Sequence, residues 1–251
     1  MSLRIAHLAD LHFGEDPPAL ADRLMADVLN AAPDAVVVSG DLTRRAQPAE
    51  FRGAFAFLAA LGKPLLVVPG NHDIPHGDLW ARFTDPRKRW RNAAAGTPRM
   101  LALPGLTLIG LDTVSRLQWH LDWSAGAISQ ARQTTLQAEL DAAPGPKIII
   151  CHHPLHHPPF ATFRRPPRGA QQTIASLRGA QVAAVLCGHL HQAELTALGT
   201  PAPVQVIAPS ALSPRGKHPN GWNLVTLDGP ALRIETRSIE AGIWRSAILQ
   251  S

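Results

Sequence analysis

The sequence predicts an α/β domain, and three observations support that prediction. Over most of the chain, apolar runs typical of strands alternate with helical patterns. The last part carries short apolar runs separated by Gly, Pro and Asn turns. The chain has 251 residues, 45% of them hydrophobic, which is enough for one large domain with a core. No stretch reads as a linker, so we expect a single domain over 1–251.

The alternating part begins with a strand over 3–9 and a helix over 17–32, where Leu20, Leu24 and Val28 repeat at helical spacing. The elements that follow are strands over 34–40, 64–70, 106–112, 147–153 and 182–189, and helices over 48–61, 129–143 and 169–180. Ser129 is a suitable N-cap for its helix. This alternation of strands and helices predicts a mostly parallel sheet.

The last part changes character and reads as consecutive antiparallel strands. These strands are expected over 193–199, 204–210, 223–229, 232–239 and 243–249. No apolar run approaches the roughly 18 residues that a membrane span needs. The first residues enter a strand pattern directly and do not read as a signal peptide. We therefore expect a cytoplasmic protein with no membrane contact.

Cysteine and arginine usage bound the chemistry further. Cys151 and Cys187 are expected to be buried free thiols, because a large core needs no disulfide. The formal net charge is +5, and arginines gather over 82–91 and in "RRPPR" over 164–168. An excess of positive charge attracts phosphates and nucleic acid. For both clusters, solvated surface arginines are the favoured interpretation.

Polar side chains follow five of the predicted strands. They are Asp10 and His12 in "ADLHFG", Asp41 in "SGDLT", Asn71, His72 and Asp73 in "GNHD", His152 and His153 in "CHHP", and His189 and His191 in "CGHLH". Ligands bind at the carboxyl ends of strands in α/β sheets. Each motif alone is common in turns and helix caps, but five in this order are not expected by chance.

The residue types in these motifs are metal ligands. Carboxylate oxygens and neutral imidazoles together suit Mn, Fe or Zn. Seven side chains, with one of the paired histidines counted, are too many for one tetrahedral ion. They suit two divalent ions that share a bridging carboxylate. Two such ions activate a water and hold both oxygens of an in-line displacement at phosphorus.

The series "DLH…GDLT…GNHD…HHP…GHLH" resembles the calcineurin-like metallophosphoesterases. Within that family it is most similar to the bacterial branch with class III cyclic nucleotide phosphodiesterases and glycerophosphodiesterases. The motifs run from Asp10 to His191, about three quarters of the chain. The resemblance implies two mixed β-sheets packed face to face with flanking helices, a four-layer sandwich.

The resemblance also implies roles for individual residues. The first ion would be bound by Asp10, His12 and His191, the second by Asn71, His152 and His189, with Asp41 and a water or hydroxide as bridges. His152 is preferred to His153 because the first histidine of "HHP" is the usual ligand in the family. His72 would be catalytic together with Asp41, with its imidazole facing the phosphate to stabilise charge or protonate the leaving oxygen.

Three further residues are candidates for supporting the site or touching substrate: Asp73, His76 and His153. Asp73 would hold the loop or orient an imidazole. His153 could line the pocket, but together with His156 and His157 we expect it to be a solvated loop histidine.

The function predicted is a dinuclear metal-dependent phosphodiesterase that cleaves a small anionic ester, with a 3',5'-cyclic nucleotide as the leading candidate. A nuclease of the same superfamily is the alternative, favoured by the basic charge but disfavoured by 5% aromatic residues and no tyrosine. A lipid A pathway pyrophosphohydrolase usually carries Arg where this chain has His72. A non-catalytic scaffold would have lost ligands that are all present here. Formation of a homodimer is left open.

Overall fold

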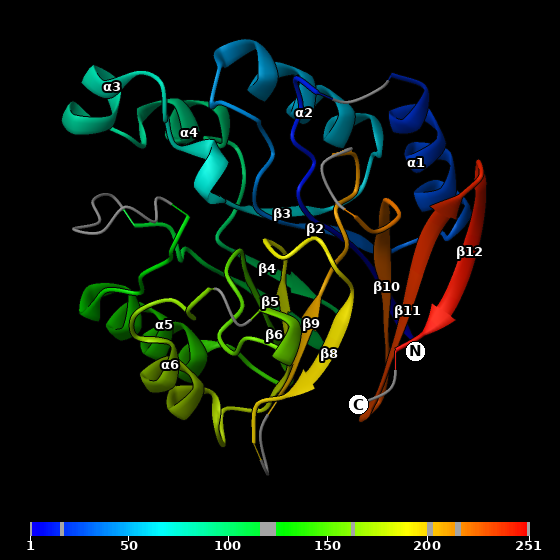
Figure 1. Cartoon of the computed structure of the whole chain (residues 1–251). Helices are drawn as coiled ribbons and strands as arrows, with labels where there is room; N and C mark the ends of the chain where they lie inside the picture. Colours follow the sequence, from blue (N-terminus) through cyan, green and yellow to red (C-terminus); the bar gives the residue numbers. More distant parts are fainter. Residues whose placement is uncertain are drawn as a thin grey trace.

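The structure, a computed structural model, describes residues 2–15, 18–115, 124–161, 164–199, 203–213 and 217–249. Two six-stranded mixed sheets pack face to face, and helices cover their outer faces (Figure 1). The predicted fold of two mixed sheets with flanking helices is therefore confirmed.

The first sheet has the strand order β12-β11-β10-β1-β2-β3. Its parallel half consists of β1 (Leu3–Leu8), β2 (Ala35–Ser39) and β3 (Leu65–Val68), and its antiparallel half of β10 (Gly221–Asp228), β11 (Ala231–Glu240) and β12 (Ile243–Ile248). Helices α1 (Pro18–Asn30) and α2 (Pro48–Ala60) connect the parallel strands. The last strands of the chain thus lie beside the first one.

The second sheet has the strand order β4-β5-β6-β7-β9-β8. Its strands are β4 (Met100–Leu103), β5 (Leu106–Leu111), β6 (Lys147–Cys151), β7 (Val182–Cys187), β8 (Glu194–Ala197) and β9 (Val204–Ile207). The prediction that β9 belongs to an antiparallel series is wrong on one side, because β9 pairs parallel with β7 and antiparallel only with β8. Strand β8 reverses the chain at the sheet edge, so β9 returns in the direction of β7 and fits between them.

Three apolar clusters hold the layers together. Between the sheets, alternate residues such as Ile5 and Val37 of the first sheet pack with Leu108 and Ile150 of the second. The outer face of the first sheet packs against α1 and α2. The outer face of the second packs against α5 (Gln130–Ala142) and α6 (Ala170–Leu177). Strands buried on both faces explain why β2 and β6 read as unbroken apolar runs.

Ser129 caps α5 as predicted, since its side chain accepts a hydrogen bond from the backbone N–H of Arg132. Cys151 and Cys187 are buried free thiols, also as predicted, with Sγ atoms 3.5 Å apart on neighbouring strands. They belong to the outer cluster under α5 and α6. Among the described residues, no helix has the length and apolar character needed to cross a membrane.

The region between β3 and β5 contains elements that the sequence patterns did not predict. They are the short helices α3 (Leu79–Thr84) and α4 (Lys88–Ala93) and the edge strand β4. Three arginines of the cluster over 82–91 form ion pairs: Arg87 with Asp112, Arg89 with Asp78, and Arg91 with Asp85. A fourth, Arg82, is buried and donates to the backbone oxygen of Pro75. These arginines therefore have structural partners and hold this region of the chain in place.

Candidate metal centre

The structure brings together all seven residues predicted to bind metals. Four overlapping groups have ligand atoms within 4.8 Å of one another: Asp10, His12 and His191; Asp10, Asp41 and His152; His12, Asp41 and His72; and His152, His153 and His189. Asn71 joins them through its Oδ1, which lies 3.0 Å from His152 Nε2. Because the groups share members, they form one continuous site at the carboxyl ends of β1, β2, β3, β6 and β7.

The backbone at this site adopts an uncommon conformation. Five of the seven residues have positive φ angles: Asp10 (52°), His12 (47°), Asp41 (50°), His189 (71°) and His191 (58°). Non-glycine residues rarely adopt this left-handed region, although Asp and His do so more readily than most. Such conformations cost free energy and gather at functional sites. Here they turn each side chain sharply off the end of its strand toward the shared centre.

Two glycines allow the carboxylates to approach the neighbouring loops. A Cβ built on Gly70 would lie 2.1 Å from Asp41 Oδ1, and one on Gly188 would lie 2.6 Å from Asp10 Oδ2. Any side chain at either position would therefore displace a carboxylate. The glycines of "GNHD" and "CGHLH" are thus required by packing against the aspartates.

Asp10 is fully buried and anchored from the second sheet. Its Oδ2 accepts a hydrogen bond of 2.9 Å from the backbone N–H of His189, and its Oδ1 lies 3.2 Å from His191 Nε2. Burial alone would raise the pKa of Asp10, but the attraction and hydrogen bond of His191, with His152, outweigh it and lower the pKa. The group is therefore a carboxylate, which is the form that binds cations.

Asp41 lies in the middle of the cluster. Its Oδ1 accepts a 2.7 Å hydrogen bond from the backbone N–H of His72, and its Oδ2 lies 3.4 Å from His152 Nε2 and 3.8 Å from His12 Nε2. Burial opposes its charge, but His152 and His72 lower its pKa. A carboxylate between two sets of imidazoles has the position that a bridging ligand requires.

His12 shows that these residues fit a metal. Both of its ring nitrogens are buried and have no hydrogen-bond partner among the described residues. Burial lowers the pKa of His12 against the opposing effect of Asp41, so the ring is neutral. A buried polar atom without a partner is costly in a folded protein. A cation between His12, Asp10 and Asp41 would satisfy it.

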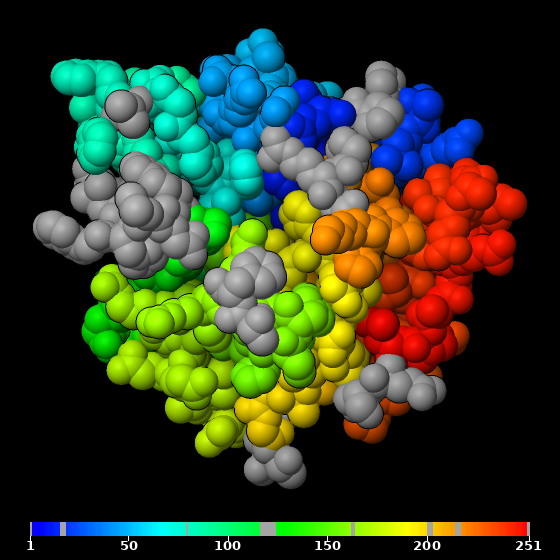
Figure 2. All heavy atoms as spheres, in the orientation of Figure 1, coloured from blue at the N-terminus to red at the C-terminus, as the bar shows by residue number. Residues whose placement is uncertain are grey.

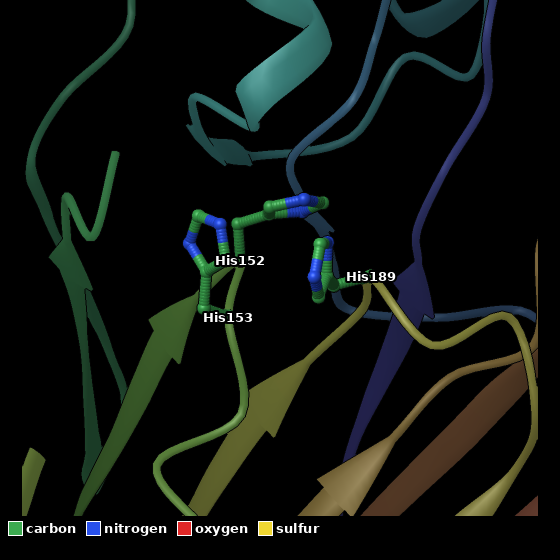
Figure 3. Close-up of side chains that lie close together, drawn as sticks. All are labelled: His152, His153 and His189. Atoms are coloured by element: carbon green, nitrogen blue, oxygen red, sulfur yellow. The ribbon is translucent and has the colours of Figure 1, made fainter. Parts of the chain in front are cut away.

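The two histidines of "CHHP" have different neighbours. His152 Nδ1 lies 2.9 Å from the backbone oxygen of Ser39, which can only accept, so Nδ1 carries the proton and Nε2 faces the site. A second partner that fixes the tautomer in this way is typical of metal-binding histidines. Figure 3 shows the His152 ring extending toward His189, with His153 on the other side.

His153 is not the solvated loop histidine that we expected, because it is buried. Its Nε2 donates to the backbone oxygen of Ser124 at 2.8 Å, and its Nδ1 accepts from the Thr113 hydroxyl at 2.8 Å. Both ring nitrogens are thus occupied, although the ring is close enough to count in a metal-binding group. His156 is exposed, as expected for a solvated loop histidine. His157 is half-buried, so the expectation agrees with the structure only in part.

His72 and His189 each have one nitrogen fixed by a neighbour. His72 Nδ1 donates to the backbone oxygen of Arg44 at 2.9 Å, which leaves Nε2 available. His189 Nε2 lies 2.7 Å from Arg164 Nη1, and a guanidinium only donates, so Nε2 accepts and Nδ1 of the neutral ring carries the proton. His189 would bind a cation through the nitrogen without a proton, which requires release of the contact with Arg164. Burial lowers the pKa of His189 well below its usual value, so its ring is neutral.

Asp73 holds together the motif loops that follow β2 and β3. It accepts hydrogen bonds from the backbone N–H groups of Gly70, Leu42 and Thr43 and from the Thr43 hydroxyl, at 2.9 to 3.2 Å. Burial, reinforced by Asp41, raises its pKa to about 7. His76 is half-buried with its ring 5.2 Å from that of His72, and burial lowers its pKa to about 4.

A cleft of about 520 Å³ opens onto the site. It is lined by Asp41, Asn71, His72, Ser124, Phe160, Ala161, Arg164, His189, Leu190, His191, Gln192, Lys217 and His218. Figure 2 shows this face, where the yellow-green, yellow and orange parts of the chain lie beside one another. Of the "RRPPR" arginines, Arg164 lines the cleft, whereas Arg165 and Arg168 are exposed outside it. No sequence motif marks Phe160, Lys217 or His218, because they lie on loops without a pattern.

A model of the calcineurin-like phosphoesterase family matches residues 3–193. The chain therefore belongs to the calcineurin-like phosphoesterase family, a class of metal-dependent enzymes that use a dinuclear metal centre, and the predicted resemblance is confirmed. The matched residues include all seven predicted ligands and His72.

Three curated relatives indicate the range of activities in the family. A probable cyclic nucleotide phosphodiesterase of Synechococcus sp. is 26% identical over 99% of this chain and 92% of its own length. A cAMP/cGMP dual specificity phosphodiesterase of Mycobacterium tuberculosis is 33% identical over 68% of this chain and 53% of its own. The DNA double-strand break repair protein Mre11 of Haloferax volcanii is 25% identical over 94% of this chain and 52% of its own. The match thus spans about half the length of the last two.

The same fold occurs in a solved structure of a dimetal phosphatase from Danio rerio. The two chains superpose with a TM-score of 0.67 over 99% of each, at 14% sequence identity. This likeness confirms the arrangement of two sheets and flanking helices.

The first testable prediction concerns the metal content. Asp41→Asn keeps the shape of the side chain but removes a negative charge that two ions would share. We expect the wild-type protein, saturated with Mn, to bind about two ions per chain and the variant to lose affinity for both. Elemental analysis after buffer exchange measures this.

Asp112→Asn is the matched control. Asp112 also follows a strand, β5, but its partners are Arg87 and Arg132. We expect wild-type metal content from this variant. Full metal content in Asp41→Asn would show that Asp41 is not a shared ligand.

Proposed function

We propose that the chain is a dinuclear metal-dependent phosphodiesterase that hydrolyses a small diester, with a 3',5'-cyclic nucleotide as the leading candidate. The observation that carries the proposal is the single buried cluster of two carboxylates, one amide and several imidazoles at the base of a cleft. A cleft of about 520 Å³ is within the range of small-molecule sites.

The first ion of the proposed centre is assigned to Asp10, His12 and His191. Their ligand atoms form one of the compact groups, and His12 has both nitrogens free of hydrogen bonds to described residues. Asp41 is assigned to both ions because it reaches His12 on one side and His152 on the other.

The second ion is assigned to Asn71, His152 and His189. The contact between Asn71 Oδ1 and His152 Nε2 supports this set, since both atoms face the same point. Mn, Fe and Zn all suit such mixed oxygen and nitrogen ligands. Two ions held there would supply an activated water and bind the oxygens of the reacting phosphate.

His72 is assigned the catalytic role that is left to the protein. Its backbone N–H is fixed by Asp41 and its Nδ1 by Arg44, so the ring is held with Nε2 available beside the cleft. Because Nδ1 already carries a proton, a second one at Nε2 would make the ring an imidazolium, which would stabilise charge on the phosphate or pass the Nε2 proton to the leaving oxygen and become neutral. Preorganisation by two hydrogen bonds is what such a role requires.

A nuclease is the second candidate, and two observations favour it. Relatives include DNA double-strand break repair proteins, and Arg164 and Lys217 add positive charge to the cleft. The presence of His72 and of the complete ligand set argues against a lipid A pathway pyrophosphohydrolase and against a scaffold. A screen of metal-loaded protein on cyclic and linear diesters, phosphomonoesters and short DNA separates these candidates. A cytoplasmic location stays a prediction from the sequence, and the formation of a homodimer stays open.

The second testable prediction separates catalysis from metal binding at His72. His72→Ala should keep the metal content and slow hydrolysis by about 10²- to 10⁴-fold, the range for loss of a positioned acid or electrostatic donor. The loss should be smaller for an aryl diester, whose nitrophenolate leaves without a proton, than for a cyclic nucleotide, whose alkoxide needs one.

The control for this prediction is His156→Ala, which removes an exposed imidazole from the loop after β6 and should leave both rates unchanged. Loss of a metal ion from His72→Ala would make His72 a ligand. Equal slowing of both esters would restrict His72 to charge stabilisation.

The third testable prediction concerns the arginine loop. Arg164→Ala should raise KM for an anionic diester more than it lowers kcat, because Arg164 lines the cleft and would bind substrate in the ground state. Arg165→Ala removes the same charge from the same loop but at an exposed position, so KM should stay near the wild-type value. Equal effects of the two variants would reduce the role of Arg164 to general electrostatic attraction.

A further inference from the structure

Phe160 is an aromatic side chain displayed in the cleft. It lies in the short 3-10 helix Pro159–Ala161, keeps 38% of its surface exposed, and lines the cleft beside the proposed metal centre. Among the described lining residues it is the one Phe or Trp. Other apolar side chains of the chain are also exposed, so what distinguishes Phe160 is its place in the lining of the cleft.

The backbone that carries Phe160 is held firmly. Fully buried Gln205 on β9 pairs with both backbone groups of His156, accepting from its N–H at 3.0 Å and donating to its oxygen at 2.7 Å. The N–H of Ala161 donates to the Pro158 oxygen at 2.9 Å, and Ala161 is buried. The prolines before Phe160 further restrict the chain. A ring on such a support loses little conformational freedom when a ligand packs against it.

The lining of the cleft combines two kinds of side chain. The metal-binding residues and Arg164 suit a phosphate. Phe160 and Leu190 add apolar surface, and Lys217 and His218 complete the lining. The cleft therefore suits a ligand that joins a phosphate to a planar, partly apolar group. Aromatic side chains stack on nucleobases regardless of the identity of the base.

We infer that Phe160 is a stacking platform for the nucleobase of a nucleotide substrate. This inference rests on the proposed function and narrows it, because a glycerophosphodiester has no planar group to occupy Phe160. The inference agrees with the low aromatic content of the chain. One aromatic side chain stacks on one base, whereas binding a nucleic-acid strand would need several.

The test compares two ligands that differ by the base alone. Adenosine 5'-monophosphate and ribose 5-phosphate are titrated calorimetrically into Mn-loaded protein. The nucleotide should bind more tightly by about 5- to 150-fold, the range that one base stacked on an aromatic ring provides. Phe160→Leu should bring the ratio of the two affinities close to one, and Phe160→Trp should keep it.

Phe83→Leu is the matched control. Phe83 is also exposed, at 55%, but belongs to α3 and does not line the cleft. Its variant should show the wild-type ratio. An equal affinity for both ligands in the wild type, or an unchanged ratio in Phe160→Leu, would overturn the inference.

Two further measurements complete the test. One distinguishes a mononucleotide from a nucleic-acid strand as the source of the base, and the other tests the base site separately from the proposed phosphodiesterase activity. A short single-stranded oligonucleotide should bind no more tightly per chain than the mononucleotide, and a large gain with length would assign Phe160 to a nucleic-acid strand. If the base preference depends on Phe160 but no diester is hydrolysed, the proposed function fails while the base site stands. If diesters are hydrolysed but the protein shows no preference for the ligand with a base, the base site fails while the proposed function stands.

Discussion

Two carboxylates, Asp10 and Asp41, are buried together with oxygens less than 5 Å apart, and their mutual repulsion must be offset by nearby positive charge. In the protein alone, imidazoles surround them and keep the pKa of both below the usual range. Imidazoles offset the charge only partly, since burial keeps His12 and His189 neutral. Two divalent cations would neutralise the remaining negative charge of the two carboxylates. The surrounding loops place further ligand side chains around Asp10 and Asp41.

The fold provides this arrangement at a cost in backbone conformation. Parallel strands of both sheets end at one edge of the sandwich, and left-handed residues there turn the side chains inward. Strained residues persist only where the surroundings determine them. Asp73 supplies part of that support, since its four hydrogen bonds join the loops after β2 and β3. Gly70 and Gly188 supply the rest by letting backbone approach the carboxylates.

Features that depend on residues close in sequence were predicted, whereas features that depend on contacts between distant segments were missed. Strand and helix periodicity identified most elements, and the order of polar residues at strand ends identified the side chains that the structure gathers into one cluster. The parallel pairing of β9 with β7 was missed because it depends on strand order across the sheet. The burial of His153 was missed because Thr113 and Ser124, distant in sequence, occupy its two nitrogens. Phe160 and Lys217 were missed because their loops meet only in the folded chain.

The central claim is that this cluster holds two ions bridged by Asp41. Anomalous diffraction from crystals of the Mn-loaded protein tests it most directly, because Mn alone would give strong peaks at a suitable wavelength. The account predicts two peaks, roughly 3.5–4 Å apart, on either side of the Asp41 carboxylate. A single peak at full Mn saturation, or two peaks without Asp41 between them, would contradict it.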